Sequence, residues 1–542
     1  MCGQECASAR ITRRSFLGAS AAAGMVAHAA GEPAAARVAA ASPKDRGPKK
    51  MLFWDLARFD DWDNVELVQG QPAFQPEATF EDRDGRKGRV IFPSVWKEPS
   101  GRWRAVYGKN WSPFPLCVLD SDDGLRWEPL PAPDLVPAGG KLAPHHVFTL
   151  ERGSGSGVYH DPIAADGYPL KFFGRQQGLP VFQRALKDPH HVWHAMAKKE
   201  GQKGYMAEGV TVGSRDGLRW EILPAATWSR PDWFPEDPVF AFYNQHLGRH
   251  VMIVRPGWGD RRVCWRETAD LKTWGPPELL FQPDPLDDTA PLGFYTMLVF
   301  PYEPGYVGLL WVFHYSNSEP VRGFNQFYFY GPMDAQLAFS YDGKRFFRGK
   351  RAPFLARNPV PEHGCAQLRP CSVVVADREI RIYSEAHRYG HGRERGPADL
   401  HDEPLSAMVL HTLRRDGFMF VRPRGDCGRM LSKPFALRAP QITASLDARY
   451  GEARFQLTNL RSEPLPGLAF EDCEPLRGVD GTELPVRWRN AALDSRLRQP
   501  LRLEIKFFGA AVYGLRADWQ WLDAQGASML EDGKPVDHLL EL

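Results

Sequence analysis

A short Asp-Gly hairpin recurs along this chain and limits the fold more than any other feature. Its clearest copies, at residues 121–127 and 214–220, read SDDGLRW and SRDGLRW. The Asp-Gly step supplies the positive backbone torsions of a tight turn, and the aspartate can bond the amides of its own turn. Related strings occur at 268–274, 340–346 and 414–418. Five copies roughly 50 to 95 residues apart are typical of β-propeller blades with loop insertions.

Each hairpin closes a unit of three or four short apolar strands, and no long amphipathic helix interrupts these units. After the last hairpin the repeats stop, and residues 442–521 alternate apolar and polar side chains as half-buried antiparallel strands do. We therefore predict an all-β chain with a five-bladed β-propeller over 51–430, a β-sandwich over 431–525 and a C-terminal tail over 526–542. The sandwich is expected to brace the propeller, with carbohydrate binding as its alternative role.

The N-terminus predicts export. Residues 12–17, TRRSFL, match a twin-arginine signal, and a small-residue apolar run follows to residue 30. This run is too short for a stable membrane span, and Ala27-His28-Ala29 provides a cleavage site. We predict a signal peptide over 1–30, a disordered spacer over 31–50, and a periplasmic or secreted protein without a stable membrane anchor.

Composition excludes some classes of partner. The 68 basic and 66 acidic residues leave a formal net charge of +2, which argues against a nucleic-acid surface or a polybasic membrane anchor. Two of the eight cysteines lie in the signal peptide. The others favour buried thiols, although Cys365 and Cys371 are close enough to pair in an oxidising compartment.

The order of propeller and sandwich resembles glycoside hydrolase families 32 and 43. The resemblance depends on the five hairpins, on YHDP at 159–162, and on the strings PLPGLAFEDCEPLRG and LRLEIKFFGAAVYGL near the C-terminus. It implies a glycosidase fold with three catalytic acids drawn from successive blades. The chain departs from family 32 in its opening, where Phe53-Trp54-Asp55-Leu56 is the nearest counterpart, and in having His160 before Asp161-Pro162.

Glycoside hydrolysis needs two carboxyl groups that face each other, one protonated and one ionised. Asp237 is the leading candidate because it begins a predicted inner strand, directly before Pro238. Glu267 is our candidate for the general acid, and Asp55 lies where the resemblance implies the base. The full set of catalytic candidates is Asp237, Glu267, Asp55, Asp161 and Asp288. The hairpin aspartates Asp123, Asp216 and Asp342 are expected to be structural.

Other side chains at or near inner strands are candidates for binding sugar hydroxyls or a sugar ring. They are His145, His146, Trp96, Tyr295, His314, Arg369 and Glu385, with Trp111 and His387 beside them. His190, His191 and His194 lack matched carboxylates, so we predict no metal site and no organic cofactor.

The sequence therefore favours an exported glycoside hydrolase acting on a polysaccharide or oligosaccharide. Two alternatives stay open. A non-catalytic carbohydrate-binding propeller would keep aromatic platforms without an opposed carboxylate pair. A polysaccharide lyase would use a tyrosine with histidine or arginine, and Tyr295, His314 and Arg369 keep that option open.

Overall fold

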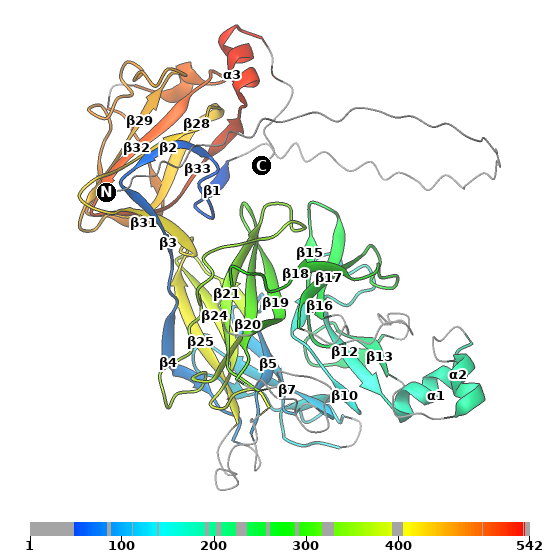
Figure 1. The fold of residues 1–542 in the computed structure, drawn as a ribbon. Helices are drawn as coiled ribbons and strands as arrows, with labels where there is room; N and C mark the ends of the chain where they lie inside the picture. The colour runs from blue at the N-terminus through cyan, green and yellow to red at the C-terminus, as the bar shows by residue number, and fades with distance from the viewer. Residues whose placement is uncertain are drawn as a thin grey trace, which may run out of the picture. The chain divides into compact units, whose positions relative to one another are not determined.

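A computed structural model describes most of the chain after residue 47. The described residues are 48–83, 88–110, 112–137, 140–189, 194–201, 207–223, 236–255, 261–287, 292–316, 330–392, 405–489, 491–534 and 536. The expected signal peptide and most of the spacer lie outside them. Within them nearly all regular structure is β-strand, so the all-β prediction is confirmed (Figure 1).

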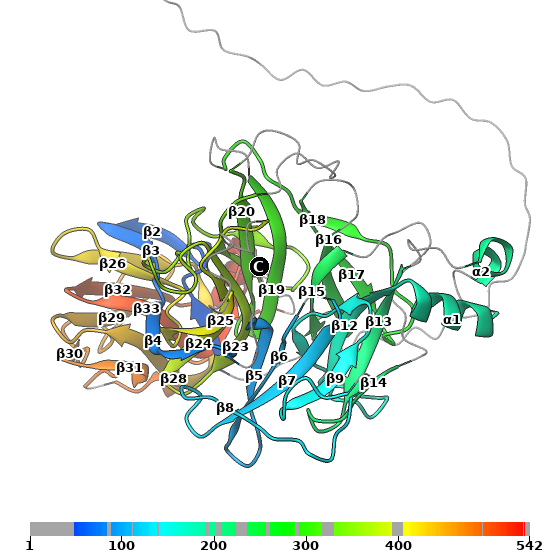
Figure 2. The same cartoon turned by 90° about the horizontal axis from the view of Figure 1, so that it is seen from below.

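Three sheets follow one another in the first half of the chain, each built from antiparallel neighbours. The first has the order β5-β6-β7-β8, with β9 paired to β7 (Figure 2). In the second, β12 pairs with β10, β11 and β13, and β13 pairs with β14; the third has the order β15-β16-β17-β18. Their strands are β5 (Ile91–Lys97), β6 (Trp103–Gly108), β7 (Phe114–Ser121), β8 (Glu128–Pro129), β9 (His146–Leu150), β10 (Gly153–Ser154), β11 (Val158–His160), β12 (Leu170–Gln177), β13 (Ala207–Ser214), β14 (Trp220–Ile222), β15 (Glu236–Asn244), β16 (Arg249–Arg255), β17 (Val263–Thr268) and β18 (Glu278–Phe281).

An eight-stranded sheet follows, with the order β19-β20-β21-β23-β24-β25-β4 and β22 paired to β21. One parallel pair of residues, Met333 and Gln367, joins its two halves, and every other pairing is antiparallel. Strand β4 comes from the N-terminal side of the repeats and pairs with β25 at their C-terminal end. The strands are β4 (Ala73–Phe80), β19 (Leu292–Tyr302), β20 (Gly305–His314), β21 (Met333–Ser340), β22 (Phe347–Arg348), β23 (Gln367–Val375), β24 (Glu379–His387) and β25 (Ser406–Arg414).

Two further sheets share one hydrophobic core. One has the order β3-β26-β33-β28-β31 with β1 on β33, and the other β2-β27-β32-β29-β30. Side chains such as Leu515 from the first and Phe455 from the second are fully buried in this core. The strands are β1 (Lys49–Leu52), β2 (Phe59–Asp63), β3 (Val65–Gln69), β26 (Met419–Pro423), β27 (Gly428–Ser432), β28 (Phe435–Asp447), β29 (Glu452–Thr458), β30 (Leu476–Arg477), β31 (Asp480–Pro485), β32 (Arg502–Phe508) and β33 (Ala511–Trp521).

These two sheets contain strands from both the beginning and the end of the described chain. Sequence patterning places residues 51–69 with the repeats, whereas β1, β2 and β3 pair with strands that follow residue 418. Local alternation does not reveal this, because pairing partners 350 or more residues apart leave no periodic signal. The helices are short: α1 (Leu179–Lys187), α2 (His194–Glu200), a 3₁₀ turn (Leu493–Arg496) and α3 (Ala524–Glu531), which occupies the start of the expected tail. Among the described residues, no helix has the length and apolarity needed to span a membrane.

The aspartate of the repeated hairpin accepts hydrogen bonds from its own turn. In the turn after β21, Asp342 Oδ1 accepts from the amides of Lys344 and Arg345, both at 2.8 Å, while Ser340 Oγ accepts from the Gly343 amide at 2.8 Å. Asp123 and Asp216 make the same contacts. The structural role expected for these three aspartates is therefore confirmed.

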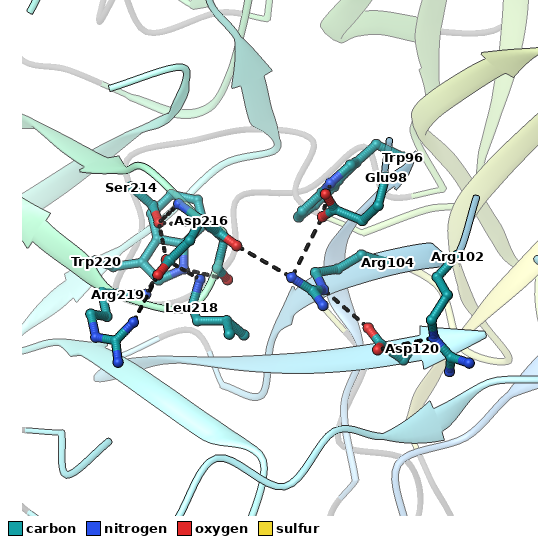
Figure 3. A network of polar contacts seen from close by, with 11 residues as sticks. Trp96, Glu98, Arg102, Arg104, Asp120, Ser214, Asp216, Leu218, Arg219 and Trp220 are labelled. Carbon is teal, nitrogen blue, oxygen red and sulfur yellow. Dashed lines mark hydrogen bonds and ion pairs between the residues drawn. The ribbon is translucent and has the colours of Figure 1, made fainter. Parts of the chain in front are cut away.

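The strands of the repeats form five strand groups: β5–β9, β10–β14, β15–β18, β19–β22, and β23–β25 with β4. The turns also receive side chains from a neighbouring strand group. Arg104 of β6 bonds Asp120 in its own sheet and donates to the Asp216 carbonyl at 3.3 Å (Figure 3). Asn244 donates to the Asp342 carbonyl at 2.9 Å, and Tyr302 to the Asp416 carboxylate at 2.8 Å. The turn that ends one strand group is thus anchored by the group before it.

The first strand group receives the same kind of contact from the last. Tyr383 of β24 donates to the Gly124 carbonyl at 2.8 Å, and Arg381 donates to the Asp123 carbonyl. The second and third groups meet through the Tyr159 hydroxyl and His250 Nδ1, 2.8 Å apart. Each of the five strand groups therefore bonds the next, and the last bonds the first.

Replacing Asp342 by alanine is expected to destabilise the protein by about 1–2 kcal/mol, because two turn amides lose their acceptor. Asparagine keeps an acceptor oxygen and should cost less. Denaturant unfolding of both variants measures the difference, and equal stability of the alanine variant and wild type would contradict the role assigned to this carboxylate.

The stability gap between wild type and Asp342→Asn should also depend on pH. Burial alone would raise the pKa of Asp342, but the amides of Arg345 and Lys344 lower it to about 2. Since the folded pKa lies below the unfolded value of about 3.9, the carboxylate stabilises the fold above pH ~4. This contribution should disappear as the pH falls through about 2, which unfolding curves across that range would measure.

Candidate functional site

Four strands that begin a repeat carry an irregularity at or near their first residues. The register of pairing shifts in β5, β15, β19 and β23, between Ile91 and Ser94, Glu236 and Phe240, Phe294 and Thr296, and Pro370 and Ser372. A β-bulge redirects side chains and is frequent beside active sites. Phe92 lies in the first of these with a φ of 49°, a conformation that a residue with a Cβ adopts at a cost.

Three arginines surround the ring of Tyr295, which lies on β19. The guanidinium carbons of Arg255, Arg261 and Arg369 are 4.6, 5.5 and 5.8 Å from its centroid. Its hydroxyl is 3.2 Å from His391 Nε2. We call these five residues the arginine–tyrosine cluster. Its members come from β16, the residues just before β17, β19, β23 and the segment after β24, so strands of two sheets contribute to it.

Glu385 holds the Arg369 side chain in place. It is fully buried, with Arg369 Nη1 at 2.8 Å, His387 Nε2 at 2.6 Å and the amide of Phe92 donating at 3.1 Å. Burial favours a raised pKa, but Arg369 and His387 outweigh it and lower the pKa of Glu385. The carboxylate is therefore ionised and committed to this network, which does not suit a proton-donating acid.

The backbone of Asp237 lies beside this cluster. Its neighbour Glu236 pairs with Arg255 across β15 and β16. Its other neighbour, Pro238, accepts a hydrogen bond from Thr296 Oγ1 at 3.4 Å, one residue from Tyr295. The side chain of Asp237 is outside the described part. Of the predicted site residues, the structure thus gathers Tyr295, Arg369 and Glu385, with the backbone of Asp237 next to them.

Three other predicted site residues are buried in separate polar networks. Asp161 bonds Lys171 Nζ at 2.8 Å and the amide of Ile163. Burial opposes ionisation of Asp161, yet the hydrogen bond from Lys171 keeps its pKa lowered. His145 contacts the Tyr107 hydroxyl at 3.0 Å, and His146 Nδ1 accepts from the amide of Leu142 at 3.1 Å. These partners, Tyr107, Leu142, Ile163 and Lys171, all lie outside the arginine–tyrosine cluster.

The remaining predicted residues are placed elsewhere. Asp55 accepts from the Tyr341 hydroxyl at 3.2 Å, and the Trp96 indole donates to Glu98 at 2.7 Å (Figure 3). Glu267 is half-buried on β17, separated from β15 by β16. His314 is paired with Asp334 at 2.8 Å. Asp288, Trp111, His190 and His191 lie outside the described residues, and His194 begins α2.

Sequence reasoning missed Arg255, Arg261 and His391. Arg255 ends the apolar run VMIVR and Arg261 precedes the apolar VCW, so both are charges at the ends of buried strands. That signal was available. His391 follows the end of β24 by several residues, and no pattern in the sequence marked it as a candidate.

The part of the chain that the structure describes has no group of three or more His, Cys, Asp or Glu side chains arranged to hold a metal ion. Cys365 and Cys371 are free thiols there, so the pairing that their spacing allowed is not formed. The described side chains at the cluster and in its supporting network are guanidinium, phenol, imidazole and carboxylate groups.

Comparisons with known proteins give only distant similarity. No protein-family model matches the chain, and no curated protein matches it. An N-acetylgalactosamine deacetylase from F. plautii has a TM-score of 0.40 and 15% identity, over 65% of this chain and 96% of its own. An α-L-arabinofuranosidase from Lactobacillus brevis has 0.36 and 12%, over 60% and 91%. The GH43 β-1,3-galactosidase BT0265 has 0.35 and 11%, over 69% of each chain.

Several similar structures are therefore glycoside hydrolases or other enzymes that act on carbohydrates. Similarities of this size assign neither a family nor an activity to this chain.

Replacing Glu385 by glutamine should destabilise the protein by about 3–5 kcal/mol, because Arg369 would remain buried without its charge partner. The matched control is Glu379→Gln on the same strand. Its partner is Arg381, and because Glu379 is more than a third exposed the change should cost less than about 1 kcal/mol. Urea unfolding of both variants measures this, and similar small losses would show that the buried network does not support the cluster.

Proposed function

We propose that the five strand groups form a five-bladed β-propeller and that the two C-terminal sheets form a β-sandwich. The contacts that link each group to the next, and β24 back to the turn at Asp123, support a ring. The pairing of β4 with β25 supports closure of its last blade by an N-terminal strand. On this proposal the bulged ends of β5, β15, β19 and β23 meet near the axis.

We further propose that the protein is an exported glycoside hydrolase that cleaves a polysaccharide or oligosaccharide. The observation that carries this is the position of Asp237 beside the arginine–tyrosine cluster. The reaction needs one ionised carboxylate, and Asp237 lies at the start of the bulged strand β15 beside this cluster. Asp237 would therefore act as the nucleophile, or as the base that activates water. Export is proposed from the twin-arginine motif and apolar run at 12–30.

The reaction also needs a carboxylic acid that protonates the leaving oxygen. Glu385 is committed to Arg369 and His387, and Asp161 to Lys171. We therefore assign the acid to Asp288. The prediction for Glu267 does not hold, because Glu267 pairs with Val251, four residues or roughly 13 Å along β16 from Arg255, and lies two strands from Asp237. A carboxyl separation from Asp237 of about 5 Å would favour retention of configuration, and about 6.5–9.5 Å inversion.

A second candidate function is favoured by the contact between the Tyr295 hydroxyl and His391. In a β-elimination, a base removes the proton next to a uronate carboxyl group, the C–O bond to the leaving sugar breaks, and an acid protonates that oxygen. Tyr295 with His391 could exchange these protons, and the arginines could stabilise the charge that develops on the carboxylate. The product would be an unsaturated uronide.

Two variants separate these functions. Asp237→Asn should lower hydrolysis by at least about 10³-fold with the fold intact, because a catalytic carboxylate is lost. Tyr295→Phe keeps the ring and removes the hydroxyl. The purified enzyme and both variants are incubated with a panel of neutral and acidic polysaccharides. Reducing ends and ultraviolet absorbance of the products are then measured, and thermal unfolding checks the fold.

Reducing ends without new absorbance, lost in Asp237→Asn, support the hydrolase. An absorbing unsaturated product, lost in Tyr295→Phe and kept in Asp237→Asn, supports the lyase and overturns the hydrolase. Saccharide binding without any product supports a non-catalytic binder and contradicts both enzymes. Full hydrolysis by Asp237→Asn removes this residue from the mechanism.

A further inference from the structure

A pocket of about 770 Å³ opens on the five-stranded sheet β2-β27-β32-β29-β30, outside the proposed propeller. Small-molecule sites typically have volumes of about 300–1,000 Å³. Strand residues alternate between faces, and Ala453 and Phe455 point into the core. Glu452 and Arg454, which line the pocket, therefore lie on the outer face of the sheet.

Two phenylalanines line this pocket. Phe508, the last residue of β32, is 44% exposed, whereas its neighbour Phe507 is fully buried in the core. Phe470, in the segment between β29 and β30, is half-buried and contributes a second apolar surface. An exposed aromatic ring among convergent polar groups is a common feature of ligand sites, and its flat face matches the C–H face of a pyranose ring.

The polar lining supplies both donors and acceptors. Lys506 is exposed and lies directly across the sheet from Arg454 on one side and Arg429 on the other. Arg429 is paired with Asp61 and Glu504, and Arg454 with Glu452, so Lys506 is the cation of this row whose described contacts include no ion pair. Asp426 and Glu471 are exposed carboxylates that line the same pocket. These groups can donate to and accept from neighbouring hydroxyls.

The charge of the lining disfavours a polyanion. Three carboxylates and two cations line the pocket: Asp426, Glu452, Glu471, Arg454 and Lys506. Glu452 is neutralised by Arg454 at 2.8 Å and by Arg477. The charged groups that remain exposed are Asp426, Glu471 and Lys506, so the net charge of the lining is balanced or slightly acidic. A chain of uronates or sulfates would therefore meet two carboxylates beside one lysine.

We infer that this pocket binds a neutral saccharide chain, with a sugar ring against Phe508 and its hydroxyls bonded to Lys506, Asp426 and Glu471. The site holds substrate polymer near the enzyme without taking part in bond cleavage. That the bound polymer is also the substrate rests on the proposed function, whereas affinity for a saccharide does not. Tethering of this kind raises the local concentration of polymer at a second site on the same chain.

The first test is native gel electrophoresis of the mature chain through gels that contain galactan, arabinan, mannan, xylan or xyloglucan, with polygalacturonate as the acidic arm. Asp237→Asn serves as the background, so that turnover does not remove the polymer. Retardation by at least one neutral polymer is expected, and it should be lost in Phe508→Ala and Lys506→Ala. The matched control is Trp62→Ala, which removes a 46% exposed aromatic from the same sheet outside the pocket lining.

The second test uses the half-buried thiol of Cys427, which lines the pocket. An oligosaccharide of the retained polymer, at about ten times its Kd, should slow alkylation of Cys427 about tenfold, because only the free pocket reacts. Cys365 is also a half-buried free thiol but lies among the repeats, so its alkylation rate should not change. Peptide mass spectrometry measures both rates in one sample.

These outcomes decide the inference separately from the proposed hydrolase. The inference would be overturned if only polygalacturonate retarded the protein, or if no polymer did. It would also be overturned if Phe508→Ala still bound the polymer, or if the oligosaccharide did not protect Cys427. Loss of turnover in Asp237→Asn bears only on the hydrolase. Phe508→Ala should keep wild-type turnover of short soluble oligosaccharides, which have no need of a tether.

Discussion

The hydrogen bonds that an aspartate makes to its own turn support the rest of this structure. At Asp123, Asp216, Asp270 and Asp342 one carboxylate oxygen accepts two successive backbone amides. These bonds stabilise the turn and leave the carbonyl group of the aspartate available as an acceptor. Those carbonyls of Asp123, Asp216 and Asp342 are what Arg381, Arg104 and Asn244 bond from neighbouring strand groups. A local motif therefore fixes both the end of one sheet and its attachment to another.

The fifth turn departs from this pattern in an informative way. Asp416 has a φ of 67° and uses its carboxylate to accept from Tyr302 and from Lys50 Nζ, both at 2.8 Å. Lys50 lies on β1, which belongs to the C-terminal pair of sheets. The chain leaves the repeats at this turn to enter β26 of those sheets. Aspartate thus caps the turn at four of the hairpins. At the fifth, Asp416 is instead a buried ion-pair partner of Lys50, where the repeats meet the C-terminal pair of sheets.

The amino-acid sequence could predict those features of the fold that short local motifs determine. The hairpins, the strand-rich content and the structural role of the turn aspartates all follow from short motifs with a known torsional reason. Sequence could not predict that β1, β2 and β3 pair with strands beyond residue 418, because such pairing is non-local. For the candidate site, Tyr295, Arg369 and Glu385 were predicted from their strand positions and lie together in the structure, while their roles stay predictions. Asp55, Asp161 and Trp96 proved to bond Tyr341, Lys171 and Glu98, and only a structure reveals such partners.

The most direct test of the proposed mechanism is a crystal structure of the Asp237→Asn variant with an oligosaccharide of a polymer that the wild-type protein is found to cleave. The account predicts a sugar ring at Tyr295, with residue 237 about 3–3.5 Å from the anomeric carbon and Arg369 still bonded to Glu385. A saccharide bound only away from Tyr295, or residue 237 directed away from the anomeric carbon, would contradict it.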